Sequence, residues 1–161
     1  MVMKKLITVL FLSAVLPTVQ GQAKKPTKEE TIQFIQKTVS NAGRDLEFQI
    51  NDTKVSWKNI EPSIGLNYNR EFTNVRFEKL LEVYQSSLSS GENSNVRIKF
   101  SVNTIKYHLT GTFYDEIKDL TIDDKDGFTI VVPREKVQSI IKAFDRLKEI
   151  TIEENKDPFQ N

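Results

Sequence analysis

The 161-residue chain contains no cysteine and a single histidine, and neither sign of charge dominates it. Without cysteine the chain can form no disulfide scaffold, no thiolate-ligated zinc or iron–sulfur site and no thiol nucleophile. One histidine leaves no His-rich metal cluster, and 23 Lys plus Arg against 22 Asp plus Glu lack the basic excess of a nucleic-acid binder. We therefore expect no metal site, no cofactor and no nucleic-acid partner.

The first 21 residues have the features of a secretory signal peptide. Two lysines precede a short apolar run over residues 6–16, and the small residue Gly21 follows it. The run is shorter than the roughly 20 residues that cross a membrane, which also disfavours an N-terminal anchor or core helix. We expect cleavage after Gly21, with Ala23 as the alternative, and a protein that is exported to the periplasm or secreted, with no transmembrane segment in the mature chain.

The rest of the chain is expected to form one domain over residues 28–152, between a polar tether at 22–27 and a polar tail at 153–161. Hydrophobic residues make up 38% of the chain, which is enough for a packed core without disulfides. No internal repeat or linker divides this region, so a single domain is the simplest organisation.

Helical periodicity marks both ends of this domain. Thr27 and Glu30 fit a capping box, and the apolar spacing that follows predicts a helix over residues 28–42, with Phe34 off its apolar stripe. Pro133 suits a first helical turn, and an apolar stripe through about residue 150 predicts a second amphipathic helix over 133–150.

Between the helices, apolar residues alternate with a period of two, which is typical of antiparallel strands. Val96–Val102 and Ile105–Leu109 predict a hairpin with a two-residue turn at Asn103-Thr104. Ile117–Ile122 and Phe128–Val132 predict a second hairpin with Asp-Gly at its tip. The predicted fold is therefore α+β, with an antiparallel sheet of about six or seven strands, an N-terminal helix and a C-terminal amphipathic helix; periodicity leaves residues 72–95 unassigned.

The chain resembles a PH-like sandwich or barrel in four strand segments and a closing helix: Val96–Val102, Ile105–Phe113, Ile117–Ile122, Phe128–Val132 and Pro133–Ile150. Its opening sequence KEETIQFI and closing sequence IIKAFDRL also resemble small exported domains of unknown function from Bacteroidetes. None of these segments contains a site motif. The resemblance implies a fold and an exported bacterial protein, but it assigns no functional residue.

Six residues are candidates for ligand binding. The alternation places four basic side chains on one face of the first predicted hairpin, where they could meet an anionic ligand or partner: Arg97, Lys99, Lys106 and His108. The competing interpretation is an ordinary solvated sheet face. Trp57 and Tyr107 are candidates to line an apolar pocket, with core packing as the competing interpretation.

The sequence offers no catalytic or metal-binding constellation. No G-x-S-x-G elbow accompanies His108, and the adjacent acids Asp115 and Glu116 would point to opposite sides of a strand. The acidic run before Gly127 departs from a calcium loop, because Pro133 falls where a bidentate glutamate is needed. We therefore expect no metal ligand and no catalytic residue.

These observations favour a non-catalytic binding or interaction module of the bacterial envelope, whose partner is an unidentified envelope protein or small ligand. A soluble carrier of a small apolar ligand is the first alternative, and it predicts a hollow between the 133–150 helix and the sheet. A carboxylate-dependent exported hydrolase is the second, and it predicts two acids converging in a cleft, one of them with a raised pKa.

Overall fold

The structure is a computed structural model that describes residues 24–86, 91–114 and 116–156. The predicted signal peptide and both candidate cleavage sites lie outside the described residues, as does Asp115. No helix within the described ranges has the length and apolar character needed to cross a membrane.

Both predicted helices are confirmed. Helix α1 (Lys28–Asn41) begins at the capping box: Glu30 N donates to Thr27 Oγ1 at 3.2 Å, and Thr27 N donates to Glu30 Oε2 at 2.8 Å. Helix α2 (Val137–Glu154) follows a 3₁₀ turn, η3 (Arg134–Lys136), and continues into residues that the sequence analysis assigned to the tail. An ion pair of 2.6 Å between Lys28 and Glu154 joins the start of α1 to the end of α2.

The α+β fold and its antiparallel sheets are confirmed, with eight strands in two sheets instead of six or seven. The large sheet has the order β1-β2-β3-β6-β7 and the small sheet the order β4-β5-β8. The large sheet contains β1 (Leu46–Ile50), β2 (Lys54–Glu61), β3 (Leu66–Thr73), β6 (Ile105–Phe113) and β7 (Glu116–Lys125). The small sheet contains β4 (Leu80–Gln85), β5 (Asn93–Phe100) and β8 (Gly127–Pro133), and two further 3₁₀ turns are η1 (Pro62–Ile64) and η2 (Phe77–Lys79).

Both predicted hairpins are wrong, because the chain changes sheets at each predicted turn. Strand β5 pairs with β4 and β8, whereas β6 pairs with β3 and β7. Neither Asn103 nor Thr104 adopts the positive φ that the predicted two-residue turn requires. The second crossing, from β7 to β8, takes place at the single residue Asp126. The alternation itself is correct, since the apolar residues of β5 and β8 face the core.

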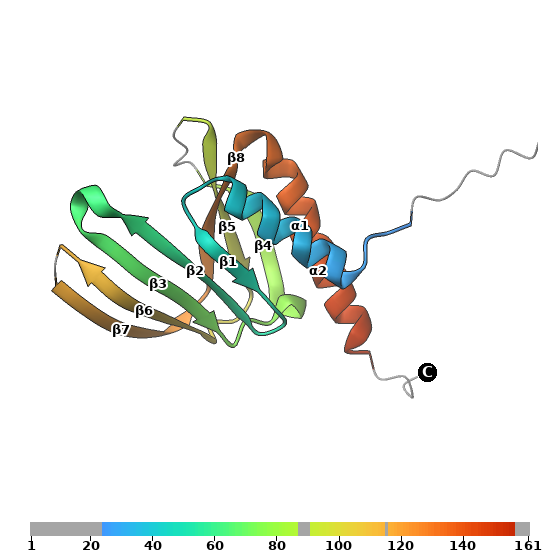
Figure 1. Cartoon of the computed structure of the whole chain (residues 1–161). Helices are drawn as coiled ribbons and strands as arrows, with labels where there is room; N and C mark the ends of the chain where they lie inside the picture. Colours follow the sequence, from blue (N-terminus) through green and yellow to red (C-terminus); the bar gives the residue numbers. More distant parts are fainter. Residues whose placement is uncertain (1–23, 87–90, 115, 157–161) are drawn as a thin grey trace, which may run out of the picture.

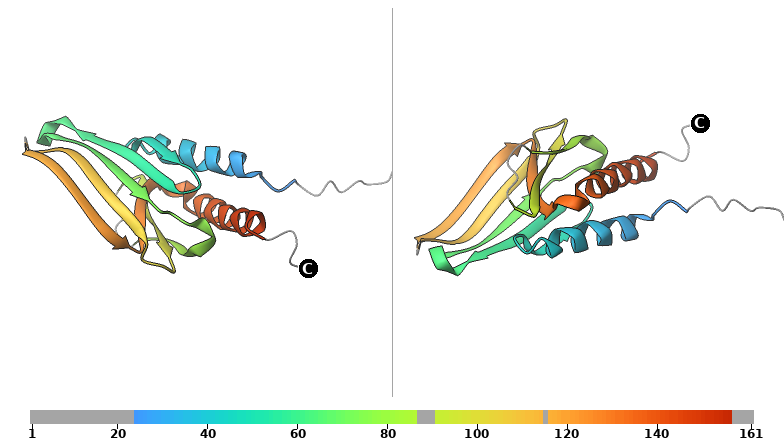
Figure 2. Two further views of the ribbon diagram at one scale, coloured as in Figure 1. Left: turned by 90° about the horizontal axis from the view of Figure 1, so that it is seen from below. Right: turned by 90° about the horizontal axis from the view of Figure 1, so that it is seen from above.

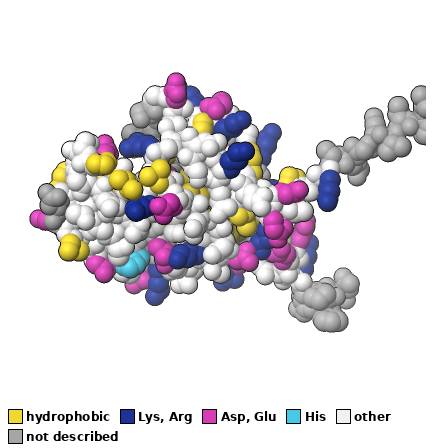
Figure 3. Space-filling view, viewed as in Figure 1, with side chains coloured by type: hydrophobic (Ala, Val, Ile, Leu, Met, Phe, Trp, Pro, Cys, Tyr) yellow, Lys and Arg dark blue, Asp and Glu magenta, His cyan; other side chains and the backbone are white. Residues whose placement is uncertain are grey.

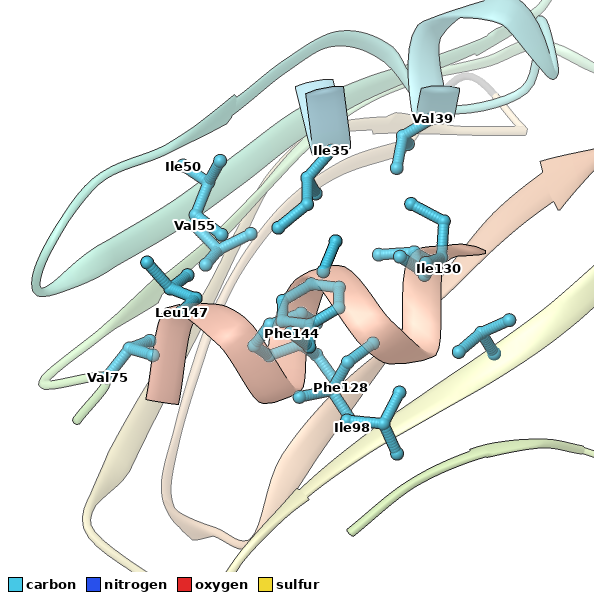
Figure 4. Close-up of a cluster of buried hydrophobic side chains, with 14 of the residues drawn as sticks. Ile35, Val39, Ile50, Val55, Val75, Ile98, Phe128, Ile130, Phe144 and Leu147 are labelled. Carbon is cyan, nitrogen blue, oxygen red and sulfur yellow. The ribbon is translucent and has the colours of Figure 1, made fainter. Parts of the chain in front are cut away.

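The helices pack side by side and cover one end of the molecule, while the large sheet continues beyond them (Figures 1 and 2). Helix α1 contacts β1 and β8, and α2 contacts β4. Figure 4 shows the core between these elements, with Phe144 of α2 lying between Ile35 of α1 and Phe128 of β8. All three of these side chains are buried.

The two faces of the large sheet differ in character. The inner face carries side chains that pack toward the core, including Val55, Trp57 and Phe72. The outer face carries polar side chains such as Ser56, which lies opposite Glu71 in the pairing of β2 with β3. This division decides where each candidate binding residue points.

Candidate functional site

A single arginine interrupts the apolar inner face of the large sheet. Strand alternation places Arg70 on the same face as its β3 neighbours Tyr68 and Phe72. It lies directly opposite Trp57 on β2 and Leu109 on β6. The sequence analysis missed this residue because residues 66–72 lack a regular alternation. The available signal was that Arg70 has an aromatic residue two positions before it, Tyr68, and another two positions after it, Phe72.

Aromatic rings hold the Arg70 guanidinium in place. Its Cζ atom lies 5.9 Å from the centre of the Trp57 ring and 5.1 Å from that of Tyr68, and its Nη2 donates to Tyr68 Oη at 3.0 Å. Cation–π contacts of this kind stabilise an arginine that is partly withdrawn from water. The Tyr68 ring in turn stacks on Phe113, with ring centres 4.4 Å apart, which extends this aromatic support.

The charge of Arg70 is not neutralised by an ion pair with any described carboxylate. Glu71, its sequence neighbour, pairs with Lys54 on the outer face at 2.6 Å, and Asp126 pairs with Arg97. The Nε atom of Arg70 is buried without a hydrogen-bond partner among the described residues. A half-buried guanidinium with unused donors is a favourable place for an anion to bind.

Arg70 lines a groove of about 250 Å³, which we call the Arg70 groove, where the inner face of the large sheet meets the small sheet. Residues from five strands and from the β7–β8 crossing form its walls. They are Arg70, Phe72, Arg97, Tyr107, Lys125, Asp126, Gly127, Phe128 and Thr129.

The groove combines positive charge with an aromatic floor. Lys125 adds a second cation that has no ion-pair partner in the described part of the chain, while Arg97 is paired with Asp126. Burial raises the pKa of the Tyr107 hydroxyl above its ordinary value of 10.0, so this group stays protonated at neutral pH and can donate a hydrogen bond. The lining of the groove therefore includes guanidinium, ammonium and hydroxyl groups that can donate hydrogen bonds.

The structure separates the six residues predicted from the sequence. Arg97 and Tyr107 line the Arg70 groove, and Trp57, only 2% exposed, lies beneath Arg70 in contact with the rings of Phe48 and Phe72. Lys99 lies on β5 opposite Gly127. Lys106 and His108 belong to the other sheet.

Lys106 and His108 therefore do not form one strip with Arg97 and Lys99. His108 lies on the outer face of the large sheet, where its Nε2 is 2.9 Å from Asp119 Oδ1, and Lys106 Nζ is 3.7 Å from Asp123. His108 also lines a polar hollow of about 400 Å³ on that face. No group of three or more His, Asp or Glu side chains in residues 24–86, 91–114 and 116–156 is placed to hold a metal ion.

Asp45 is a buried carboxylate that ties the large sheet to the small one. Its Oδ2 accepts from Val131 N on β8 at 2.9 Å, and its Oδ1 accepts from Asn59 Nδ2 on β2 at 3.1 Å. Burial raises the pKa of Asp45 above its ordinary value of 3.8, and the bond from Val131 opposes part of this shift. Because these hydrogen bonds link β2 to β8, we assign Asp45 a role in holding the two sheets together.

We expect the Asp45→Asn variant to become more stable relative to the wild-type protein as the pH rises above 3.8. The folded wild-type chain holds the Asp45 proton more tightly than the unfolded chain does, so its stability falls as the pH rises through the raised pKa. Asparagine keeps an acceptor for Val131 and has no charge to bury. Urea unfolding at a series of pH values, followed by Trp57 fluorescence, measures the difference. The raised pKa of Asp45 would be contradicted if the difference in unfolding free energy between the variant and the wild-type protein stayed constant, within measurement error, from about pH 3.5 to about pH 7.

Comparison of the chain with known protein families, with curated proteins and with solved structures finds no match. The PH-like likeness and the resemblance to exported Bacteroidetes domains therefore stay predictions. Any function has to be inferred from the geometry of the chain's own residues.

Proposed function

We propose that this protein is an exported, non-catalytic binding module whose Arg70 groove receives a carboxylate group. The observation that carries this proposal is the Arg70 guanidinium, which lines a groove without an ion-pair partner among the described residues. A planar guanidinium can bind a carboxylate through two parallel hydrogen bonds, which gives both energy and orientation.

The size of the groove limits what can enter it. Pockets for drug-sized ligands usually measure about 300–1,000 Å³, whereas this groove measures about 250 Å³. It suits one functional group, such as a carboxylate on a small molecule or on the side chain of a protein partner. The aromatic walls formed by Phe72, Tyr107 and Phe128 favour a carboxylate that is attached to a short apolar stem.

The packing of the core favours a binding module over the two alternatives. Phe144 and Phe128 fill the space between α2 and the small sheet, where an apolar carrier would need a hollow. A carboxylate-dependent hydrolase would need a second acid facing a carboxyl with a raised pKa. The carboxyl group with the raised pKa is that of Asp45, and it accepts hydrogen bonds from Val131 N and Asn59 Nδ2 instead of facing a second acid.

We expect N-acetylglutamate to bind the full mature chain in the Arg70 groove, and Arg70→Gln to weaken that binding at least about tenfold. Two-dimensional ¹H–¹⁵N NMR at constant ionic strength gives the affinity and the location together. The amides of Tyr107, Gly127 and Thr129 should shift on titration, because these residues line the groove.

Two controls separate the groove from general surface charge. Arg76→Gln removes an exposed arginine beside η2 that is paired with Glu78, and it should leave the affinity unchanged. N-acetylglutamine, which lacks the side-chain carboxylate, should bind more weakly than N-acetylglutamate. Equal loss of affinity in both arginine variants, or shifts confined to surface lysines, would show that the groove is not the site.

Native mass spectrometry of the protein purified from its own exported fraction, without refolding, can identify the natural ligand. A small molecule that carries a carboxylate, or a protein partner with an essential acidic residue, would support the proposal. A co-purified apolar ligand would favour the carrier instead.

A further inference from the structure

The polar hollow of about 400 Å³ lies on the outer face of the large sheet, opposite the face that carries the Arg70 groove. Its lining comes from four neighbouring strands, β1, β2, β3 and β6. Figure 3 shows this face around the cyan side chain of His108, the only histidine of the chain. Trp57 and Arg70 turn their side chains to the inner face, so they contribute backbone to the floor of the hollow. The other eight lining residues are all polar or charged, and this excludes an apolar ligand.

Four of the lining side chains are uncharged and can both donate and accept hydrogen bonds. Gln49 lies opposite Ser56 in the pairing of β1 with β2, and Asn69 lies opposite Thr110 in the pairing of β3 with β6. None of these four side chains has a hydrogen bond to another residue in the described part of the chain. Alcohol groups also donate and accept, so a ligand rich in hydroxyl groups matches this set of amides and hydroxyls.

The charged side chains of the polar hollow favour a ligand without net charge. Glu71 is paired with Lys54 at 2.6 Å, and His108 faces a carboxylate of β7 as described above. Two charged lining residues remain, Glu47 and Lys58, and neither has an ion-pair partner among the described residues. Because one is negative and the other positive, an ion of either sign would be attracted by one and repelled by the other.

Glu47 reaches the polar hollow through an irregular stretch of β1. Its φ is +53°, a left-handed conformation that residues other than glycine seldom adopt, and the pairing of β1 with β2 shifts register between Leu46 and Gln49. A β-bulge redirects side chains, and backbone conformations of this kind are concentrated at ligand sites. The bulge thus adds a charged acceptor to the hollow at the edge of the sheet.

The dimensions of the polar hollow favour an elongated ligand. Neighbouring strands lie about 4.8 Å apart, so its four strands span about 14 Å. The volume of about 400 Å³ falls in the range of about 300–1,000 Å³ that is usual for small-molecule sites. A small zwitterion could contact Glu47 and Lys58 but would leave the uncharged groups on β3 and β6 unused.

We propose that the polar hollow binds a neutral saccharide of two linked rings. Its hydroxyl groups exchange hydrogen bonds with the amides and hydroxyls of all four strands. Glu47 accepts and Lys58 donates the stronger, charge-assisted hydrogen bonds. The proposal does not depend on the Arg70 groove, which opens on the opposite face of the sheet.

The test titrates the full mature chain with maltose, cellobiose, lactose and N,N′-diacetylchitobiose and follows binding by two-dimensional ¹H–¹⁵N NMR. At least one disaccharide should bind with a Kd of about 1 mM or lower and shift the amides of Gln49, Asn69 and Thr110. The double variant Gln49→Ala/Asn69→Ala should weaken this binding at least about tenfold, since it removes two amides that reach the ligand.

The matched control is the double variant Asn67→Ala/Thr121→Ala. Both residues are exposed and lie on the same outer face, since Asn67 is opposite Thr112 and Thr121 is opposite His108, but neither lines the polar hollow. This variant should bind the disaccharide as the wild-type protein does. Both double variants are first checked for an unchanged urea unfolding curve, so that misfolding is not read as lost binding.

Three results would overturn the proposal. The first is no shift around the polar hollow with any of the four disaccharides at about 20 mM, which would leave an ordinary solvated sheet face. The second is an equal loss of affinity in the two double variants. The third is tighter binding by glycylglycine, which would assign the hollow to a zwitterion. Competition between the disaccharide and N-acetylglutamate is not expected, because the two probes address opposite faces of the sheet.

Discussion

Phe144→Ala should lower the free energy of unfolding by about 3–5 kcal/mol, the usual range for truncating a buried phenylalanine. The Phe144 side chain is fully buried, and Figure 4 shows it projecting from α2 between Ile35 of α1 and Phe128 of β8. Its ring centre is 6.3 Å from that of Phe77, which belongs to the turn before β4. Truncation leaves a cavity among α1, α2 and the small sheet. Because regular secondary structure surrounds this cavity, the site can collapse only in part.

Urea unfolding provides the measurement, with the fluorescence of Trp57 as the probe, because Trp57 is the only tryptophan and is buried. Phe34→Ala is the matched control: Phe34 also belongs to a helix, but it is 39% exposed, so we expect a change of about 1 kcal/mol or less. Similar effects for the two variants would show that the space between α2 and the small sheet is not tightly packed.

The parts of the fold that depend on neighbouring residues could be predicted from the sequence. The capping box at Thr27 and Glu30 forms as expected, since its two hydrogen bonds join residues three apart. The apolar stripe of α2 also faces the core as expected, because helical periodicity alone decides which side chains share a face.

Strand partners could not be predicted in the same way. Alternation shows which residues of β5 and β6 are buried, but a hairpin and a crossing between two sheets bury the same residues equally well. What distinguishes the two arrangements is the segment after Phe100, which lacks the backbone conformation of a tight turn. That information depends on contacts of β5 with β4 and β8, which are distant in sequence from the predicted turn.

The same dependence on contacts between distant residues explains why the candidate site could be predicted only in part. Arg97 was chosen for the basic face of the predicted hairpin and Tyr107 as a wall of an apolar pocket. Both line the Arg70 groove, although they reach it from different sheets. Arg70 could not be selected by its own sequence pattern, because its importance arises from Trp57 and Tyr68 around it and from the lack of a paired carboxylate among the residues that the structure describes.

Gly127→Ala should destabilise the protein by at least about 3 kcal/mol, at or beyond the upper end for inserting a methyl group into a packed site. A Cβ atom at residue 127 would lie 1.9 Å from Ile98 O and 2.9 Å from Ile98 C, both in the backbone of β5. Backbone atoms cannot rotate away as a side chain would, so β8 must move away from β5 at the point where the two begin to pair. Urea unfolding measures this effect directly.

Gly91→Ala is the control for replacing a glycine of positive φ where no backbone clash follows; Gly127 itself has a φ of +156°. Gly91 has a φ of +61°, and no atom of the described residues lies within 4 Å of an added Cβ, so alanine there should cost only the about 1–2 kcal/mol of a left-handed backbone. Gly127 also lines the Arg70 groove together with Phe128 and Thr129. Any folded fraction of Gly127→Ala should therefore bind N-acetylglutamate more weakly although Arg70 is intact, whereas Gly91→Ala should bind it normally. Normal binding by Gly127→Ala would mean that the crossing from β7 to β8 does not shape the groove.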